Sequence, residues 1–189
     1  MGLKADAPRI SLMLALKDCF KGRYSLSREL GLGEGVIRRL YRELRREGLI
    51  TVVRGGARLT PLGVVRLEEE LGRCGIIAIK LFKPDSVMGE GLMGVVAALA
   101  ASIRNVVDAR DCVVRAGARS ALVIKRGSGR FYLPLVEDYD LERGMPRLYA
   151  ALSSMPSRSR SFVAAFAETL TPCVEGVIRV AALARNSLV

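Results

Sequence analysis

Residues 34–47 read Glu-Gly-Val-Ile-Arg-Arg-Leu-Tyr-Arg-Glu-Leu-Arg-Arg-Glu, and this stretch decides how the N-terminal part of the chain is interpreted. At 100° per residue, its apolar residues share one arc of a helix and its arginines lie opposite. The apolar residues are Val36, Ile37, Leu40 and Leu44, and the arginines are Arg38, Arg39, Arg42, Arg45 and Arg46. One face therefore predicts packing on a core, while the other offers guanidinium groups to phosphates or guanine bases.

Shorter patterns surround this helix. Apolar residues recur at helical spacing from Arg9 to Gly22, and Ser25 is placed to cap a short helix over Leu26–Leu30. Two β-prone runs within residues 49–60 are separated by two glycines, which predicts a tight hairpin with a primed turn. A further helix is expected to begin at Pro61, with Leu62, Val65 and Leu71 on its apolar side.

The order helix, helix, arginine-rich helix and hairpin resembles the winged helix-turn-helix transcriptional regulators. The resemblance covers roughly residues 9–73 and is carried by residues 24–50 and the exit segment 59–63. It implies that helix 34–47 enters the major groove of DNA and that hairpin 49–60 touches the backbone or minor groove. The DNA-binding residues that it implies are Glu34, Gly35, Arg38, Arg39, Arg42, Arg45, Arg46, Arg54 and Arg58.

The helix departs from that family in its first turn. It opens Gly33-Glu34-Gly35, where such regulators often place Ser or Thr, and this argues against base readout there. Two glycines instead favour close approach of the backbone to a phosphate. A solvated arginine face and a protein-interaction module are the alternatives. Double-stranded DNA is favoured over RNA because no aromatic stacking platform is evident.

Residues 75–189 predict a second, α+β domain after a first domain over residues 1–74. Strands are expected over Ile76–Phe82 and Leu92–Ala100, a helix over Arg104–Ala116, a hairpin from Ala121–Lys125 and Phe131–Val136, helices over Met145–Ser154 and Ser161–Thr169, and a strand over Val177–Leu183. Helices should cover one side of the sheet. Arg110-Asp111, the 116–118 segment and Leu133-Pro134 resemble an uncharacterised domain that follows the winged helix in one archaeal family, which implies no chemistry.

Two segments of this second part are candidate ligand sites. Glu90 and Gly91 end a glycine-bearing loop that lacks the pattern of phosphate-binding loops. Ser157-Arg158-Ser159-Arg160 precedes the helix expected at 161–169, so hydroxyls, guanidinium groups and free amides could converge on an anion. An ordinary connection and a plain helix cap are the alternatives.

The composition excludes histidine chemistry. The 189 residues include 30 Lys+Arg and 19 Asp+Glu, for a formal net charge of +11, and no His. Ser-His-Asp and Cys-His sets and histidine-bound metals are therefore absent. The acidic residues at 137–142 match no recognised calcium loop, so we expect no metal and no cofactor. The charge divides into +6 on residues 1–74 and +5 on residues 75–189, which points to an anionic partner without locating it.

Cysteines and apolar runs indicate the compartment. Cys19, Cys74, Cys112 and Cys173 form no CxxC pair, and we expect buried free thiols, with a disulfide as the alternative. The scarcity of Asn, Gln and His hints at a thermophilic source. The N-terminal residues lack a signal-peptide pattern, and the uncharged run 91–103 is too short to span a bilayer. We expect a soluble, cytoplasmic protein with no membrane partner.

These observations favour a transcriptional regulator that binds double-stranded DNA. Its C-terminal domain would form a homodimer, bind a small-molecule effector such as an anion, or do both. Two-fold pairing would place two recognition helices about one DNA turn apart. The alternative is an enzyme whose chemistry lies in the C-terminal domain. Its only acid/base candidates are Asp85, Glu90, Asp108 and Asp111, and no spacing marks two of them as a pair.

Overall fold

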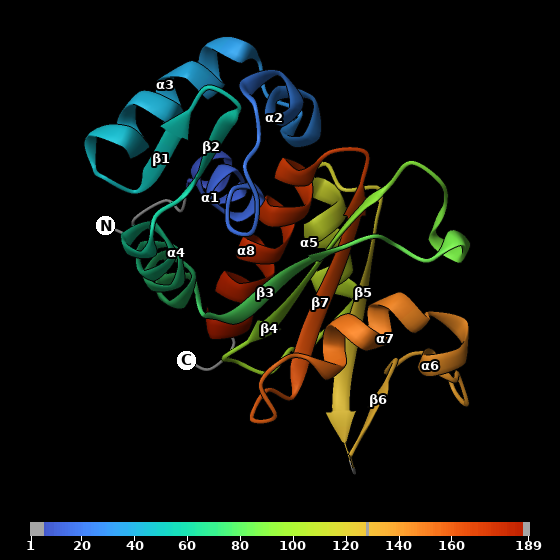
Figure 1. Ribbon diagram of the computed structural model, residues 1–189. Helices are drawn as coiled ribbons and strands as arrows, with labels where there is room; N and C mark the ends of the chain where they lie inside the picture. Colours follow the sequence, from blue (N-terminus) through green and yellow to red (C-terminus); the bar gives the residue numbers. More distant parts are fainter. Residues whose placement is uncertain (1–5, 128, 187–189) are drawn as a thin grey trace.

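The computed structural model describes residues 6–127 and 129–186 (Figure 1). The protein has an α+β fold, as its sequence predicts: helices accompany a five-stranded antiparallel sheet, and a two-stranded hairpin stands apart from that sheet. Among the described residues, no helix is long and apolar enough to cross a membrane.

The N-terminal part consists of four helices and the hairpin. Its elements are α1 (Ala7–Ala15), α2 (Arg23–Leu30), α3 (Glu34–Arg46), β1 (Ile50–Val53), β2 (Gly56–Leu59) and α4 (Pro61–Cys74). Gly31 ends α2 in the left-handed conformation. The Thr60 hydroxyl accepts from the Gly63 amide at 3.0 Å and so caps α4, which begins at Pro61.

Details of this part differ from the expectations. Helix α1 ends at Ala15 rather than Gly22, and Lys21 forms an isolated bridge with Ala57 of the hairpin. Ser25 lies inside α2, and Gly22 occupies the N-cap.

The hairpin turn is not primed. Among the described residues of this turn, the positive φ falls on Gly56 rather than on either central residue, Arg54 or Gly55. On α4, Leu62 and Val65 are exposed, and the buried side is formed by Gly63, Leu67 and Leu71.

The C-terminal part is built on the sheet. Its strands are β3 (Ile76–Phe82), β4 (Met93–Leu99), β5 (Ser120–Gly127), β6 (Arg130–Tyr132) and β7 (Ser161–Ala167), in the order β3-β4-β7-β5-β6. Its helices are the 3-10 turn η1 (Ser86–Met88), α5 (Val106–Arg115), α6 (Leu141–Gly144), α7 (Pro146–Ser153) and α8 (Leu170–Asn186).

Two elements of this part differ in type from the expectation. The segment expected as a helix at 161–169 is the central strand β7, which is buried along its whole length. A short apolar run without polar positions fits a doubly covered strand as well as a helix. The segment expected as a strand at 177–183 belongs to the 17-residue helix α8, in which Glu175 and Arg179 pair at i,i+4.

Helices cover both faces of the sheet, not one (Figure 1). Alternate side chains of β4 and β7 enter two separate cores. Val95 and Val163 join the core beneath α5 and α8, while Val96 and Phe162 join the core beneath α6 and α7. This alternation explains why β7 reads as continuously apolar.

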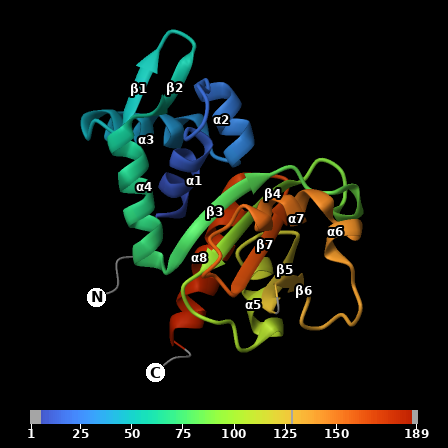
Figure 2. The ribbon, with the colours of Figure 1, turned by 60° about the horizontal axis from the view of Figure 1, so that its bottom comes forward.

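Helix α8 joins the sheet to the N-terminal helices. One hydrophobic core contains residues of α1, α3 and α4 together with residues of α5, α8 and the sheet. The Thr171 hydroxyl donates to the Leu30 carbonyl at 2.7 Å, which fixes the start of α8 on the end of α2. Figure 2 shows the hairpin β1–β2 extending from the N-terminal part on the side away from the sheet.

All four cysteines are free. Only Cys173 is fully buried; Cys74 and Cys112 are half-buried, and Cys19 is exposed. The expectation of four buried thiols is therefore right for one residue, and no disulfide joins any pair.

Candidate nucleic-acid interface

Helix α3 is held by the apolar arc that its sequence predicts. Ile37, Leu40 and Leu44 are fully buried. Tyr41, on the edge of this arc, is largely buried and donates from its hydroxyl to the Lys21 carbonyl at 3.0 Å. Burial raises the pKa of the Tyr41 hydroxyl. The buried side of α3 leaves its arginines facing outward, and all five are exposed.

The hairpin is anchored to the segment that precedes α2. Lys21 and Ala57 exchange two backbone hydrogen bonds, each of 3.0 Å. A Cβ on Gly56 would lie 2.5 Å from the carbonyl carbon and oxygen of Lys21, so this position needs glycine. At the side of the hairpin, the Arg58 guanidinium lies 5.3 Å from the centre of the Phe20 ring, a cation–π distance.

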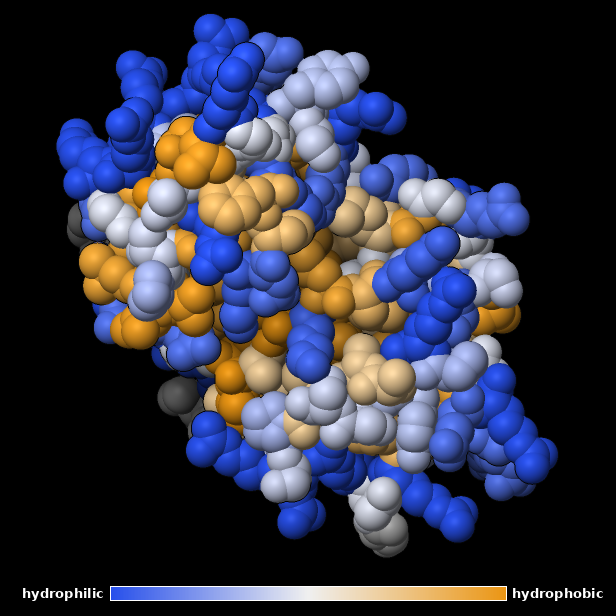
Figure 3. All heavy atoms as spheres, viewed as in Figure 1, coloured by the Kyte–Doolittle hydropathy of each residue, from blue (hydrophilic) through white to orange (hydrophobic). Residues whose placement is uncertain are grey.

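A groove of about 1110 Å³ separates α3 from the hairpin. Its walls come from the start of α2, the outward face of α3 and the tip of the hairpin. The lining residues are Gly22, Arg23, Tyr24, Glu34, Arg38, Tyr41, Arg42, Arg45, Val52, Val53, Arg54, Gly55 and Gly56. Figure 3 shows long hydrophilic side chains projecting from the part of the molecule that holds α3.

Ion pairs divide the arginines into two groups. Arg38 lies 3.6 Å from Glu34, and Arg39 lies 3.1 Å from Glu43, both at i,i+4 on α3. These pairs are more than half exposed at their arginines, so they constrain the side chains weakly. In the described part of the chain, no carboxylate lies within ion-pair distance of the other three arginines of α3 or of the arginine at the hairpin tip. These are Arg42, Arg45, Arg46 and Arg54.

The groove gathers some of the residues expected to bind DNA and leaves others outside. It contains Glu34, Arg38, Arg42, Arg45 and Arg54. The residues outside its lining are Gly35, Arg39, Arg46 and Arg58. The Arg58 guanidinium contacts the Phe20 ring, and Arg39 forms an ion pair with Glu43. The DNA-binding role of either set stays a prediction.

Sequence reasoning missed eight groove residues: Gly22, Arg23, Tyr24, Tyr41, Val52, Val53, Gly55 and Gly56. Tyr24 is 70% exposed, and the two valines are 42% and 49% exposed, so an apolar strip lies among the arginines. One signal was present in the sequence. Two successive valines in a two-stranded hairpin cannot both face the core, so at least one had to face outward.

The first turn of α3 is open. Gly33 is the N-cap and makes no side-chain cap, and a Cβ on Gly33 or Gly35 would meet nothing within 4 Å. The φ of Gly33 is −61°, which other residues adopt easily. Neither steric crowding nor this backbone angle requires a glycine at position 33. Because Gly33 and Gly35 carry no side chain, another molecule can approach the helix N-terminus closely.

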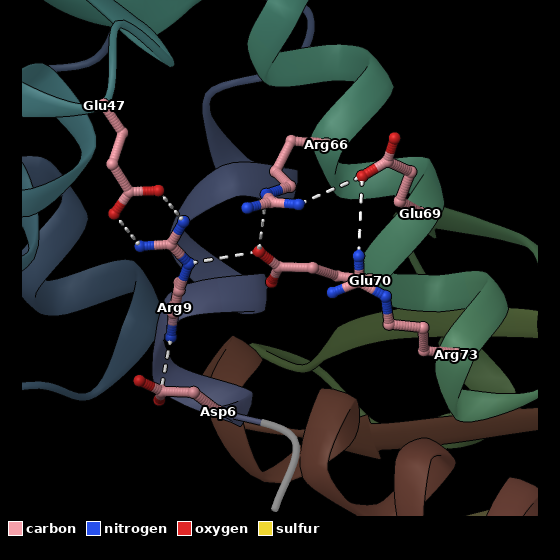
Figure 4. A network of polar contacts seen from close by, with 7 residues as sticks. All are labelled: Asp6, Arg9, Glu47, Arg66, Glu69, Glu70 and Arg73. Atoms are coloured by element: carbon pink, nitrogen blue, oxygen red, sulfur yellow. Dashed lines mark hydrogen bonds and ion pairs between the residues drawn. The ribbon is translucent and has the colours of Figure 1, made fainter. Parts of the chain in front are cut away.

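A polar network braces the opposite end of α3 (Figure 4). Arg9 of α1 donates to both carboxylate oxygens of Glu47, at 3.0 and 2.7 Å, and to Glu70 of α4 at 3.3 Å. These hydrogen bonds lower the pKa of Glu47 and raise the pKa of Arg9. Arg66 and Arg73 extend the network along α4. The network fixes α3 relative to α1 and α4.

The candidate ligand residues of the C-terminal part do not form one site. Met93 pairs with Ala167 and Leu99 with Ser161, so Glu90 and Gly91 lie beyond one end of β7 and the 157–160 segment lies at the other. That segment precedes a strand rather than a helix, so the expected anion site at a helix N-terminus is wrong. Ser157, Arg158 and Arg160 are exposed, and Ser159 is buried with no partner for its hydroxyl among the described residues.

Three of the four carboxylates considered for catalysis interact with other groups rather than with one another. Asp85 accepts from the amides of Arg147 and Leu148 at 3.0 and 3.2 Å and thereby caps α7. Asp108 accepts from Asn105 at 2.7 Å, and Asp111 lies 3.9 Å from Arg115. Residues 6–127 and 129–186 contain no group of three or more His, Cys, Asp or Glu residues that could hold a metal.

Comparison with known proteins adds a likeness of fold. No family model and no curated protein matches the chain. A solved structure, the hypothetical protein PH0730 from Pyrococcus horikoshii OT3, is similar with a TM-score of 0.67 and 21% sequence identity. The match covers 96% of this chain and 93% of that one, so the arrangement of helices and sheet extends over both proteins.

Proposed function

We propose that the protein is a DNA-binding transcriptional regulator of the winged helix type. Helix α3 would lie in the major groove, and the hairpin β1–β2 would touch the backbone or minor groove. The C-terminal part would serve dimerisation, effector binding or both. Double-stranded DNA is the partner that suits a groove lined by guanidinium groups and open at a helix N-terminus.

One observation carries this proposal: Arg42 and Arg45 of α3 and Arg54 of the hairpin line the same groove without a carboxylate partner among the described residues. Guanidinium groups on a merely solvated helix face are commonly balanced by acidic residues at i,i+4. On α3, Arg38 and Arg39 have such acidic partners. Arg42 and Arg45, which line the groove, have none among the described residues. Phosphates would supply the missing charge.

The test is a fluorescence-anisotropy titration on duplex DNA over a series of salt concentrations. The variant Arg42→Ala/Arg45→Ala removes two groove arginines, and Arg158→Ala/Arg160→Ala removes two exposed arginines from the far end of β7. We expect the groove variant to bind about 10–100-fold more weakly and its salt slope to fall by about 2, since each lost phosphate contact removes close to one counterion.

The control variant has the same net charge, so it corrects for the loss of long-range attraction. Equal affinity and an equal salt slope for the wild-type protein and the groove variant would refute the assignment of this groove. An equal loss in both variants would reduce the interaction to unspecific attraction by net charge.

A further inference from the structure

The outer face of helix α5 is exposed, and its apolar and charged residues are arranged symmetrically about the middle of the helix. Its inner face is formed by Ala109 and Val113, both fully buried. On the outer side, Val107 is 52% exposed and Val114 is 48% exposed. These two valines are seven residues apart, about 10 Å along the same side of the helix.

Two opposite charges lie midway between the valines. Arg110 and Asp111 are both exposed, and the weak contact of Asp111 with Arg115, at 3.9 Å, leaves its carboxylate open to solvent. Along this face the order is therefore apolar, positive, negative, apolar. When a second α5 runs antiparallel about an axis between Arg110 and Asp111, each valine meets a valine and each charge meets its opposite.

We propose that this face of α5 is the two-fold interface of a homodimer. Val107 lies against the partner's Val114, and Arg110 lies against the partner's Asp111; the symmetry repeats each contact. A second copy is favoured over another protein because the face is complementary to itself. The inference does not depend on DNA binding.

The contact is short, because α5 has 10 residues. Stable interfaces bury about 800 Å² on each partner, so we expect a dimer that dissociates on dilution. Sedimentation velocity over a concentration series measures this equilibrium for the full chain. Arg110→Asp sets like charges against each other twice, and we expect the dimer dissociation constant to rise at least ~30-fold.

The double variant Arg110→Asp/Asp111→Arg exchanges the two charges and restores their complementarity across the axis, so it should dimerise nearly as well as the wild-type protein. Arg158→Asp makes the same change of charge at an exposed site outside helix α5 and serves as the control. Circular dichroism checks that each variant is folded.

Weakening by Arg110→Asp with recovery in the double variant supports the interface. A wild-type chain that stays monomeric at the highest concentration it tolerates overturns the proposal. It is also overturned when Arg110→Asp changes the equilibrium no more than Arg158→Asp does, or when the double variant fails to recover. A failure of DNA binding in the groove variant leaves this result untouched, because the two experiments measure different equilibria.

Discussion

Gly56 is the residue of the hairpin that tolerates substitution least. Its φ is +144°, and a Cβ there would collide with the Lys21 backbone. Gly56→Ala must displace the Lys21–Ala57 bridge, and we expect the free energy of unfolding to fall by about 1–3 kcal/mol. Urea denaturation measures the change. Gly55→Ala is the control: a Cβ at Gly55 meets nothing within 4 Å, so the effect should stay below about 0.5 kcal/mol.

Gly35 offers a substitution with opposite effects on stability and binding. A Cβ there meets nothing within the protein, so Gly35→Ala should raise the free energy of unfolding by about 0.5 kcal/mol through better helix propensity. If a phosphate approaches the first turn of α3, the added methyl group should weaken DNA binding. Thermal denaturation and anisotropy are measured on the same sample. A more stable variant with unchanged DNA affinity would place Gly35 outside the interface.

Glu47 makes the stability of the N-terminal part dependent on pH. Hydrogen bonds from Arg9 lower the pKa of Glu47 in the folded chain below its ordinary value of 4.5. The stabilisation is therefore complete above the unfolded pKa and is lost as the pH falls through the lower, folded pKa. Glu47→Gln should cost about 0.5–1 kcal/mol at neutral pH, and the difference from the wild-type protein should vanish in acid.

Denaturant titrations at both pH values test this dependence. Glu34→Gln is the matched control, because Glu34 is 61% exposed and lies 3.6 Å from its arginine. Its effect on stability should be too small to measure at either pH. A loss for Glu47→Gln that persists unchanged in acid would contradict an electrostatic origin.

At the scale of elements, helices with a polar face were predictable, whereas continuously buried runs were predicted correctly at β4 and wrongly at β7. The bounds of α3 and α5 follow from periodicity, since each exposes one side to water. Strand β7 is buried on both faces, so its sequence carries no period of two or 3.6. The valines and isoleucine of α8 suggest a strand when taken alone, although they belong to a helix that runs from Leu170 to Asn186.

A substitution of Phe166 tests the central placement of β7 in the sheet. Its side chain is fully buried, and its ring centroid lies 5.9 Å from that of Phe82 in an edge-to-face arrangement. We expect Phe166→Ala to lower the free energy of unfolding by about 3–5 kcal/mol. Chemical denaturation measures the loss. Tyr132→Ala on the outer strand β6, 45% exposed in the wild-type protein, should cost far less. Similar losses at the two positions would contradict the central placement of β7.

The candidate site was predictable as a face but not as a groove. Helical spacing alone puts the arginines of α3 on one side. Which of them remain unpaired depends on Glu34 and Glu43, whose side-chain positions no periodicity gives. The convergence of Tyr24, Val52 and Val53 on α3 is a tertiary effect of the Lys21–Ala57 bridge.

At the scale of the whole molecule, Cys173 reports on global unfolding. It lies in the core shared by the N-terminal helices and the sheet, and burial raises the pKa of its thiol to about 12. Cys19 is exposed. A thiol reagent should therefore modify Cys19 rapidly and Cys173 only as fast as the chain unfolds. Mass spectrometry over time follows each residue. Rapid modification of Cys173 in the native protein would contradict a shared, cooperative core.

The packing of α1 and α2 on α8 also has a consequence for synthesis on the ribosome. Leu30 and Thr171, which join α2 to α8, are 141 residues apart in the chain. The N-terminal helices therefore emerge long before the helix that completes their core. During that interval part of their apolar surface faces solvent or a chaperone, and the arginine-rich face of α3 is made before it is firmly positioned.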